Sequence, residues 1–401
     1  MRWSLVWDHD LIFLCQVHYK ILTLNINFLY SSVFFQHFAY GLIIPTLLVW
    51  QHQAGLSYAE IGTIQAVGFL FMLIAEIPSS YFADRVSKRI TLLLGFAFSI
   101  LSFIFLIQAD NFVFFLIMQI LFSVGGAFFS GTQESMLHDL MSVEIKMTKS
   151  LGKLSIFDET GTVLGMLGSS FFISNYSIKA SFIAGLAALI IGLLSIALIS
   201  TPNTLSRKED TFSSSTKVHI KSVSTLIIIL FFSFMALRGE ILFQSTFEEL
   251  HIDLALLGLI YIFGKIFSIV GSMYAHKIED CLGFKKSMTL VACLQIASFS
   301  ILLFSELILT ITAISIYFFS ENIFRNIRDS WILYRAPLNR RASAISSVSF
   351  STAVFALAFT PIIGLGIDQA VYWGIAILVF AKLIGFVLVF NGRLNKPNLQ
   401  F

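Results

Sequence analysis

A charged segment interrupts the apolar sequence at residues 76–89, which read Glu76-Ile77-Pro78-Ser79-Ser80-Tyr81-Phe82-Ala83-Asp84-Arg85-Val86-Ser87-Lys88-Arg89. Long apolar runs flank its charged end, at residues 56–82 and 90–108. A short link with this density of charge cannot lie in hydrocarbon, so it must form a tight turn in water between two helices. The segment therefore predicts a helical membrane protein with more than one span.

The composition of the whole chain also predicts a membrane protein. Of its 401 residues, 57% are hydrophobic and 12% are charged, whereas soluble domains carry about 25% charged residues. The net charge of +3, without a basic stripe interleaved with aromatic residues, argues against nucleic acid as a partner. Cys15, Cys281 and Cys293 lack disulfide or metal-ligand spacing, and the chain has no phosphate-binding loop and no nucleophile with a plausible base. We therefore expect no enzymatic activity, no cofactor and no metal.

Apolar runs separated by polar breaks predict an all-α protein of twelve membrane spans in two halves of six. The N-terminal half, residues 22–201, contains spans at roughly 22–48, 56–83, 90–108, 112–140, 150–174 and 178–201. The C-terminal half, residues 223–391, contains spans at roughly 223–248, 254–277, 286–305, 308–335, 343–366 and 370–391. A cytoplasmic linker at 202–222 joins the halves, an extension at 1–21 is cytoplasmic or interfacial, and 392–401 form a cytoplasmic tail.

The distribution of Lys and Arg predicts the orientation of the spans. Alternate turns are basic, with Arg85, Lys88, Arg89, Lys146, Lys149, Lys153, Arg207, Lys208, Lys217, Lys221, Lys277, Lys285, Lys286, Arg335, Arg340 and Arg341. The other turns contain Lys179 together with Asp110, Glu248, Glu249, Asp253, Glu306 and Asp368. Because cytoplasmic loops are enriched in Lys and Arg, both termini are expected in the cytoplasm.

The charged segment resembles the loop between helices 2 and 3 of the major facilitator superfamily, whose pattern is Gly-x-x-x-Asp-Arg-x-Gly-Arg-Arg/Lys. Its charged positions are matched by Asp84, Arg85, Lys88 and Arg89, while Ser80 and Ser87 replace the usual glycines. The preceding Glu-Ile-Pro is similar to a branch of bacterial permeases that includes many efflux proteins. A fainter copy, residues 280–286, follows the eighth span, as expected for two similar halves.

This resemblance implies a fold of two six-helix halves, usually monomeric, in the cytoplasmic membrane of a bacterium. It also implies that helices 1, 4, 7 and 10 line a central cavity. The loop with Asp84, Arg85, Lys88 and Arg89 is expected to gate the conformational change by stabilising the outward-open state.

Charged groups within spans are candidates for the transport site, because a charge at membrane depth is costly unless it is paired or hydrated. Glu321, Arg325 and Arg328 share one face of the tenth span. They form either a substrate or coupling cluster, or an internal Glu321–Arg325 pair that fixes packing. Polar and charged groups on spans 1 and 7 join those of span 10 in the predicted substrate site. We expect the substrate to bind Gln36, Arg238, Glu240, Gln244, Glu321, Asn322, Arg325 and Arg328.

Three acids are candidates for proton coupling: Glu134, Asp158 and Glu321. Many family members carry a coupling arginine midway along the fourth helix, and residues 121–126 here contain none. Gly152, Gly161 and Gly165 match half of the glycine pattern of the antiporter branch. In this chain Met166 stands where that pattern has a proline. Lys265 and Lys382 lie on helices expected to be peripheral, where a lysine extends to the membrane surface or packs with a partner.

The sequence as a whole predicts a secondary active transporter of a small polar or charged molecule, most plausibly anionic or zwitterionic. Its partners are expected to be this substrate, protons and the lipid bilayer. Proton-coupled export is the favoured mechanism. The alternatives are a proton-coupled uptake symporter and a non-transporting sensor or assembly partner on the same fold.

Overall fold

The computed structural model describes residues 7–140, 147–200, 223–335 and 341–391, and these form helices joined by short turns, without strands. The predicted linker at 202–222 and the tail at 392–401 lie outside the described residues. The first group of helices comprises α1 (Trp7–Ile43), α2 (Leu47–Gln53), α3 (Tyr58–Arg85), α4 (Lys88–Gln108), α5 (Phe112–Phe129), α6 (Thr132–Leu140), α7 (Met147–Asn175) and α8 (Ile178–Ala197). The second group comprises α9 (Val223–Met235), α10 (Glu240–Glu249), α11 (Leu254–Ile301), the short 3-10 turn η1 (Leu302–Phe304), α12 (Leu307–Arg335), α13 (Arg341–Gln369) and α14 (Val371–Asn391).

Within the described residues, eight helices are long and apolar enough to cross a membrane. A ninth is added if the bent pair of Thr23–Ile43 and Leu47–Gln53 counts as one span. The structure thus confirms an all-helical protein with many apolar spans, while the number twelve stays a prediction.

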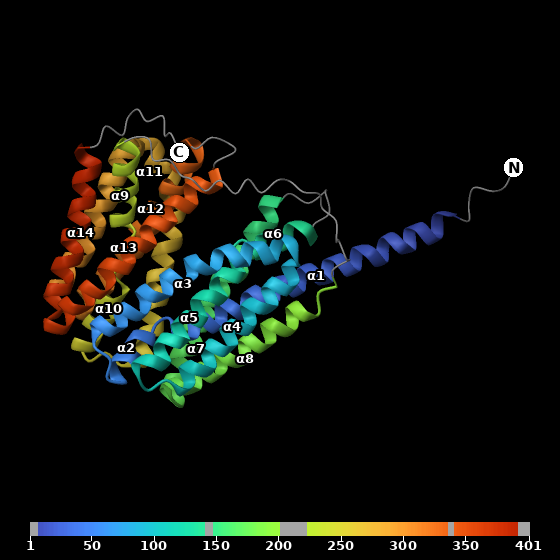
Figure 1. Ribbon diagram of the computed structural model, residues 1–401, viewed down its shortest axis with the longest axis horizontal. Helices are drawn as coiled ribbons and strands as arrows, with labels where there is room; N and C mark the ends of the chain where they lie inside the picture. Colours follow the sequence, from blue (N-terminus) through green and yellow to red (C-terminus); the bar gives the residue numbers. More distant parts are fainter. Residues whose placement is uncertain (1–6, 141–146, 201–222, 336–340, 392–401) are drawn as a thin grey trace.

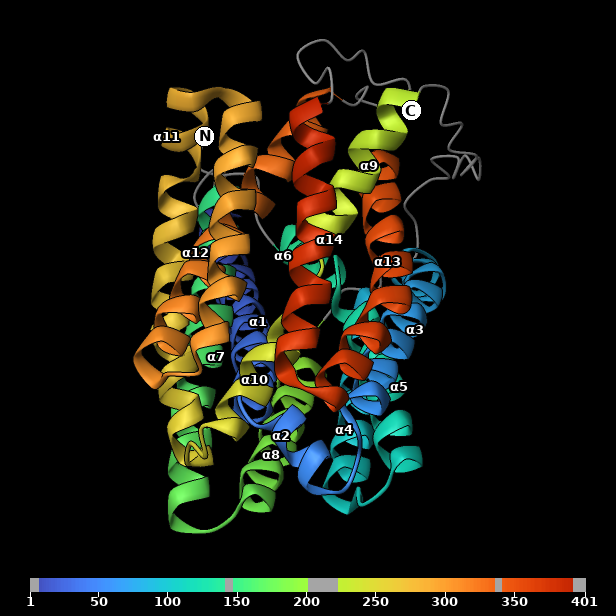
Figure 2. The ribbon, with the colours of Figure 1, turned by 90° about the vertical axis from the view of Figure 1, so that its left-hand side faces the viewer.

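Helix α11 is two helices joined across a kink. Its 48 residues are more than twice the roughly 20 that cross a bilayer, and Gly283 within it has φ 73° and ψ 162°. A positive φ is accessible to glycine at little cost, so the chain can turn sharply there. Figure 2 shows the two legs of α11 running side by side. The turn falls between the predicted spans 254–277 and 286–305.

Local signals in the sequence explain where several helices begin. The Ser57 hydroxyl accepts a hydrogen bond from the Glu60 N–H at 3.2 Å, and the Glu60 carboxylate accepts one from the Ser57 N–H at 2.8 Å. This reciprocal arrangement satisfies two N–H groups at the start of α3. Ser87 and Asn111 cap α4 and α5 in the same sense, so the charged turn at 84–87 is a true helix boundary.

Glycines of the antiporter-like pattern bring two helices of the first group together. A Cβ on Gly161 would collide with the backbone of α1 at Phe34, and one on Gly165 would collide with α1 at Phe38 and Gly41. Small residues at such contacts let helix backbones approach closely in a membrane. Gly161 and Gly165 therefore have a packing role between α7 and α1.

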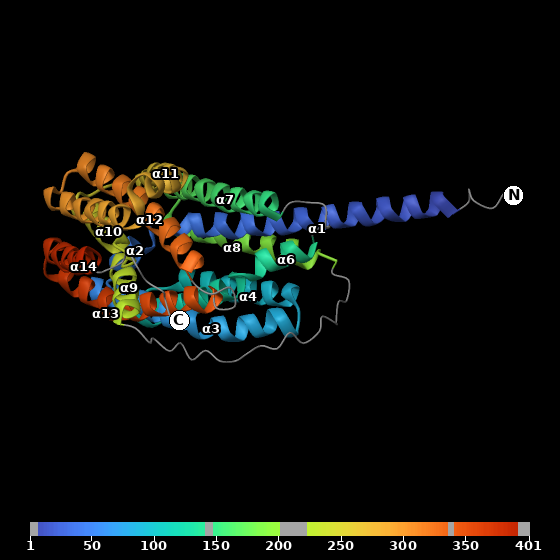
Figure 3. The same cartoon turned by 90° about the horizontal axis from the view of Figure 1, so that it is seen from above.

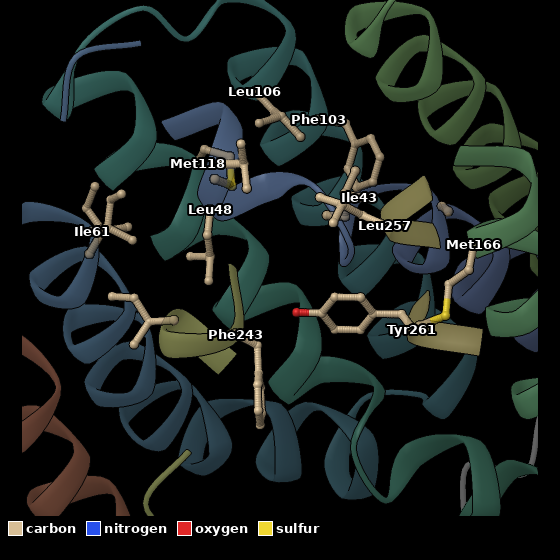
Figure 4. Packing of buried hydrophobic residues seen from close by; sticks show 14 of the residues in the cluster. Ile43, Leu48, Ile61, Phe103, Leu106, Met118, Met166, Phe243, Leu257 and Tyr261 are labelled. Atoms are coloured by element: carbon tan, nitrogen blue, oxygen red, sulfur yellow. The ribbon is translucent and has the colours of Figure 1, made fainter. Parts of the chain in front are cut away.

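The two groups of helices meet at one end of the molecule and diverge toward the other (Figures 1 and 3). We call the end that contains α2, α10 and the start of α3 the closed end, and the opposite end the open end. At the closed end, one hydrophobic cluster includes side chains from both groups. Figure 4 shows Tyr261 and Leu257 of α11 beside Ile43, Leu48 and Met166 of the first group.

Candidate functional site

The break between α9 and α10 places charged groups between the two groups of helices. The Arg238 side chain is 64% exposed, and its Nη1 lies 4.0 Å from the Glu240 carboxylate. Its guanidinium carbon lies 5.9 Å from the ring centroid of Phe69, which belongs to α3 of the first group. Arg238 of the second group therefore contacts the first group through Phe69.

The charged face predicted on α12 is divided among different partners. The Glu321 carboxylate accepts a hydrogen bond from Gln295 Nε2 of α11 at 2.9 Å. Arg328 Nε donates to the Asp329 carboxylate at 2.8 Å, and its guanidinium lies over the Phe324 ring. The Arg325 side chain is exposed, and among the described side chains no ion pair joins it to Glu321. The simple internal Glu321–Arg325 pair is thus not what the structure shows.

Other predicted residues have contacts that hold helices together. Asn322 Nδ2 donates to the Ser268 hydroxyl of α11, so its amide faces the neighbouring helix. Gln36 of α1 accepts a hydrogen bond from Gln133 Nε2 of α6 at 2.6 Å, and both side chains are buried. The amides of Asn322 and Gln36 are therefore engaged by the protein in this conformation.

Lys382 on α14 is fully buried, and sequence reasoning did not place it at the site. Its ammonium donates to the Met235 carbonyl at the end of α9, beside the break that carries Arg238. Of the two interpretations from the sequence, the structure supports packing with a partner rather than extension to the surface.

One of the three acids considered for coupling, Asp158, lies in an ion pair on α7. His37 Nδ1 of α1 lies 2.7 Å from the Asp158 carboxylate, and the two side chains are 25% and 40% exposed. Lys265 of α11 lies 2.8 Å from the next acid, Glu159, so this pair joins the two groups of helices. The third candidate, Glu134, is exposed on α6. His138, one turn further along the same helix, pairs with Asp139 at 3.9 Å.

Gln244, predicted to bind substrate, joins the two groups at the closed end. Its Oε1 accepts from the N–H groups of Leu48 at 3.1 Å and Val49 at 3.3 Å, and its Nε2 donates to the Ile44 carbonyl at 3.1 Å. The same Nε2 donates to the Tyr261 hydroxyl at 3.2 Å. Gln244 thus satisfies backbone groups that the bend between α1 and α2 leaves free.

Two acids that sequence reasoning assigned to the loops complete the closed end. The Asp368 carboxylate of α13 accepts from the N–H groups of Tyr58 at 2.6 Å and Ala59 at 2.9 Å, at the start of α3. The Glu248 carboxylate of α10 accepts from the Tyr58 hydroxyl at 2.5 Å and lies 2.8 Å from His52 Nδ1. In the sequence, each of these acids is visible only as an acid at the end of a span. That it faces the start of α3 becomes clear only once the packing of the helices is known.

The predicted gating loop lies at the open end, and the contacts described for it stay within the first group. Lys88 Nζ lies 2.6 Å from the Asp139 carboxylate, and Arg89 donates to the Ala197 carbonyl. The Asp84 and Arg85 side chains are exposed. No group of three or more His, Cys, Asp or Glu side chains suited to a metal occurs in the described part of the chain.

The profile of the Major Facilitator Superfamily matches residues 29–361. The chain belongs to the Major Facilitator Superfamily. The resemblance seen in the loop at 76–89 is thereby confirmed, and the chain is a member of a transporter family rather than of an enzyme family.

Among proteins of this superfamily, the quinolone resistance protein NorA of Staphylococcus aureus is 25% identical over 176 residues, which cover 43% of this chain and 45% of NorA. The uncharacterized MFS-type transporter YxaM of Bacillus subtilis is 26% identical over 145 residues, or 36% of each chain. The matches thus span less than half the length of these curated relatives.

Solved structures share the fold over nearly the whole chain. The crystal structure of the nucleoside transporter NupG aligns with a TM-score of 0.78 and 13% identity, covering 91% of this chain and 97% of that one. A POT family transporter in complex with 5-aminolevulinic acid aligns with a TM-score of 0.72 and 13% identity, covering 94% and 96%. At these identities the likeness shows the fold alone.

Proposed function

We propose that the protein is a secondary active transporter of a small polar or charged molecule and works by alternating access. One observation carries this proposal: the two groups of helices are joined by polar contacts at one end and diverge at the other, with charged side chains between them. Opening the closed end while closing the open end would expose Arg238 and its neighbours to the opposite side of the membrane.

We propose that the open end faces the cytoplasm and that the chain crosses the membrane twelve times. The charged turn after α3 and the turn near Gly283 both lie at the open end and carry basic residues, including Lys88 and Lys285. Asp110, Glu248 and Asp368 lie at the closed end. Twelve spans result if α1 with α2, α5 with α6 and α9 with α10 each form one bent span and α11 forms two. The bacterial relatives support the cytoplasmic membrane as the location.

The charges between the groups favour an anionic or zwitterionic substrate. Arg238 and Arg325 are exposed, whereas the Glu321 carboxylate is held by Gln295. An exposed guanidinium at membrane depth is costly without water or an anionic partner, which a carboxylate or phosphate on the substrate would supply. Glu240, beside Arg238, would meet the positive group of a zwitterion.

We propose proton-coupled export as the direction of transport. The similarity to NorA, whose name denotes quinolone resistance, supports export, although it covers less than half of either chain. Glu321 and Asp158 are the carboxylates that we expect to carry the proton, because Glu321 lies within a membrane-spanning helix beside Gln295, and Asp158 pairs with the titratable His37. Glu134 is less favoured, because it is exposed and lies outside these clusters.

The test is proton movement in proteoliposomes of known orientation, followed with a pH-sensitive dye against a panel of small anions, zwitterions and cations. Proton flux opposite to an added compound establishes antiport and identifies the substrate class. Flux in the same direction as the compound establishes an uptake symporter instead. Silence across the panel, together with no binding of any compound, would favour a non-transporting sensor and refute the proposal.

A further inference from the structure

We infer that His37 of α1 and Asp158 of α7 form a proton-binding pair, in which the histidine ring takes up and releases the transported proton. This inference rests on the proposed function, because it names the proton acceptor that coupled transport requires. The sequence alone indicates three acids for coupling, whereas the structure adds His37 as a basic partner of one of them.

The contact between the two side chains assigns a role to each nitrogen of the ring. His37 Nδ1 lies 2.7 Å from the Asp158 carboxylate, and the Tyr40 ring packs edge-on against the imidazole, with 5.9 Å between ring centroids. An ionised carboxylate only accepts hydrogen bonds, so Nδ1 carries a proton in this contact. Nε2 is therefore the nitrogen that can take up a second proton and make the ring cationic. Histidine is the side chain suited to exchange a proton between about pH 5 and pH 8.

Close packing of α1 against α7 builds this contact. Gly161 lies three residues after Asp158 on the same face of α7, and a Cβ on Gly161 would come within 3.3 Å of the His37 Cβ. The same Cβ would collide with the α1 backbone, so glycine is what lets the two helices come this close. Two turns earlier in α1, the Tyr30 ring stacks on Phe157, with 5.1 Å between ring centroids. His37 therefore meets Asp158 because the two helices are held together at two further points.

The pair lies beside an ion pair that joins the two groups of helices. Glu159, the residue after Asp158, lies 2.8 Å from Lys265 of α11. When His37 carries both protons, its charge and that of Lys265 balance the two acids. Loss of the proton leaves one negative charge uncompensated beside Glu159, which adds to the attraction for Lys265. Release of the proton should therefore strengthen the contact between α7 and α11, and uptake should weaken it.

Other charged groups on the helices packed against α1 have positions or partners of their own. The helices in question are chiefly α7, α8 and α6. Besides Asp158, the charged or titratable side chains described on them are Lys153, Glu159, Lys179, Glu134, His138 and Asp139. Glu159 pairs with Lys265. Asp139 pairs with Lys88, and Lys179 lies over the Trp50 ring. The remaining three are exposed, so Asp158 is the charged partner that the structure gives His37.

A double-mutant cycle of thermal unfolding in detergent tests the pair without any substrate. His37→Asn keeps an amide nitrogen near the position of Nδ1 but cannot take up a proton, and Asp158→Asn removes the counter-charge. At about pH 6 the double variant should be roughly 2 °C more stable than the sum of the two single losses in Tm predicts, and this coupling should shrink at about pH 8. A coupling of equal size at both pH values, or none, would overturn the inference, because a merely structural hydrogen bond does not depend on pH. The control cycle pairs His138→Asn with Asp139→Asn, a more exposed pair at 3.9 Å, and should be additive throughout.

Transport by the same variants tests the coupling role. His37→Asn should abolish the proton flux that a panel compound drives in the wild type, because the ring that accepts the proton is gone. Exchange of labelled for unlabelled compound across the membrane requires no net proton movement and should continue. His138→Asn should keep both activities. Wild-type proton flux in His37→Asn, or loss of both activities in the folded variant, would overturn the inference. Should His37→Asn fail to fold, His37→Gln, whose amide can also donate to the carboxylate, replaces it in both assays.

The two readouts separate the inference from the proposed function. A silent wild-type protein in the flux assay would refute proton-coupled transport, whereas the unfolding cycle would still decide whether His37 and Asp158 bind a proton together. Proton flux in the wild type that His37→Asn leaves unchanged would refute the inference and leave the transporter proposal intact.

Discussion

Replacing Gln244 with leucine should open the closed end, because this buried amide supplies three hydrogen bonds between the two groups of helices. Leucine fills a similar volume but leaves the N–H groups of Leu48 and Val49 and the Ile44 carbonyl without that partner. A typical intramolecular hydrogen bond contributes about 1 kcal/mol net, so the closed state should lose roughly 3 kcal/mol. This loss corresponds to roughly a 100-fold shift in the equilibrium between closed and opened ends.

The shift can be measured as a distance between spin labels across the closed end. Val113, in the first turn of α5, and Ile308, in the first turn of α12, are 57% and 77% exposed and belong to different groups. With the native cysteines replaced by serine, Gln244→Leu should move most molecules to a longer distance between these labels. The control is Ser245→Ala, because the Ser245 hydroxyl donates within its own helix, to the Leu242 carbonyl. Unchanged distances in folded Gln244→Leu protein would refute the conclusion that Gln244 holds the closed end together.

Two further predictions concern contacts between the groups. Glu159→Gln should lower the population ratio of closed to opened ends by up to about fivefold in the same distance measurement, because its pair with Lys265 is partly exposed. Exchanging the two charges should restore the wild-type distribution of distances. A charge exchange that fails to restore it would show that the pair has no part in the equilibrium. Asp368→Asn should lower Tm by a few degrees and lengthen the label distance, because the carboxylate on the Tyr58 N–H stabilises the start of α3 from another helix. Asp253→Asn is its control, since Asp253 caps its own helix, and a longer distance in this control as well would contradict the reasoning.

The sequence predicted the fold well because its signals are local. Apolar runs of about twenty residues, the charged turn at 84–89 and the glycine at 283 each mark a helix or a boundary without reference to the rest of the chain. Breaks within spans were harder to predict. The bend after Ile43 and the break at 236–239 lie inside stretches that the sequence predicts as single spans, 22–48 and 223–248. They persist because Gln244 and Lys382 satisfy the freed backbone groups.

The candidate site was predicted less completely, because its partners come from helices distant in the chain. Glu321 and Arg325 share a face by spacing, yet the acid accepts its hydrogen bond from Gln295 of a neighbouring helix. Helical periodicity says which residues share a face but not which helix that face meets. For the same reason, Glu248 and Asp368 read as loop acids in the sequence and serve as inter-helix contacts in the structure.

The most direct test of alternating access is to lock the closed end and measure transport. His52 Nδ1 of α2 lies 2.8 Å from Glu248 Oε1 of α10. Cysteines at both positions can therefore be joined by a short, reducible thiol crosslinker. Alternating access predicts that the crosslinked protein loses proton-coupled flux in proteoliposomes and regains it on reduction, while each single-cysteine variant treated alike remains active. Full flux through the crosslinked protein would contradict the account.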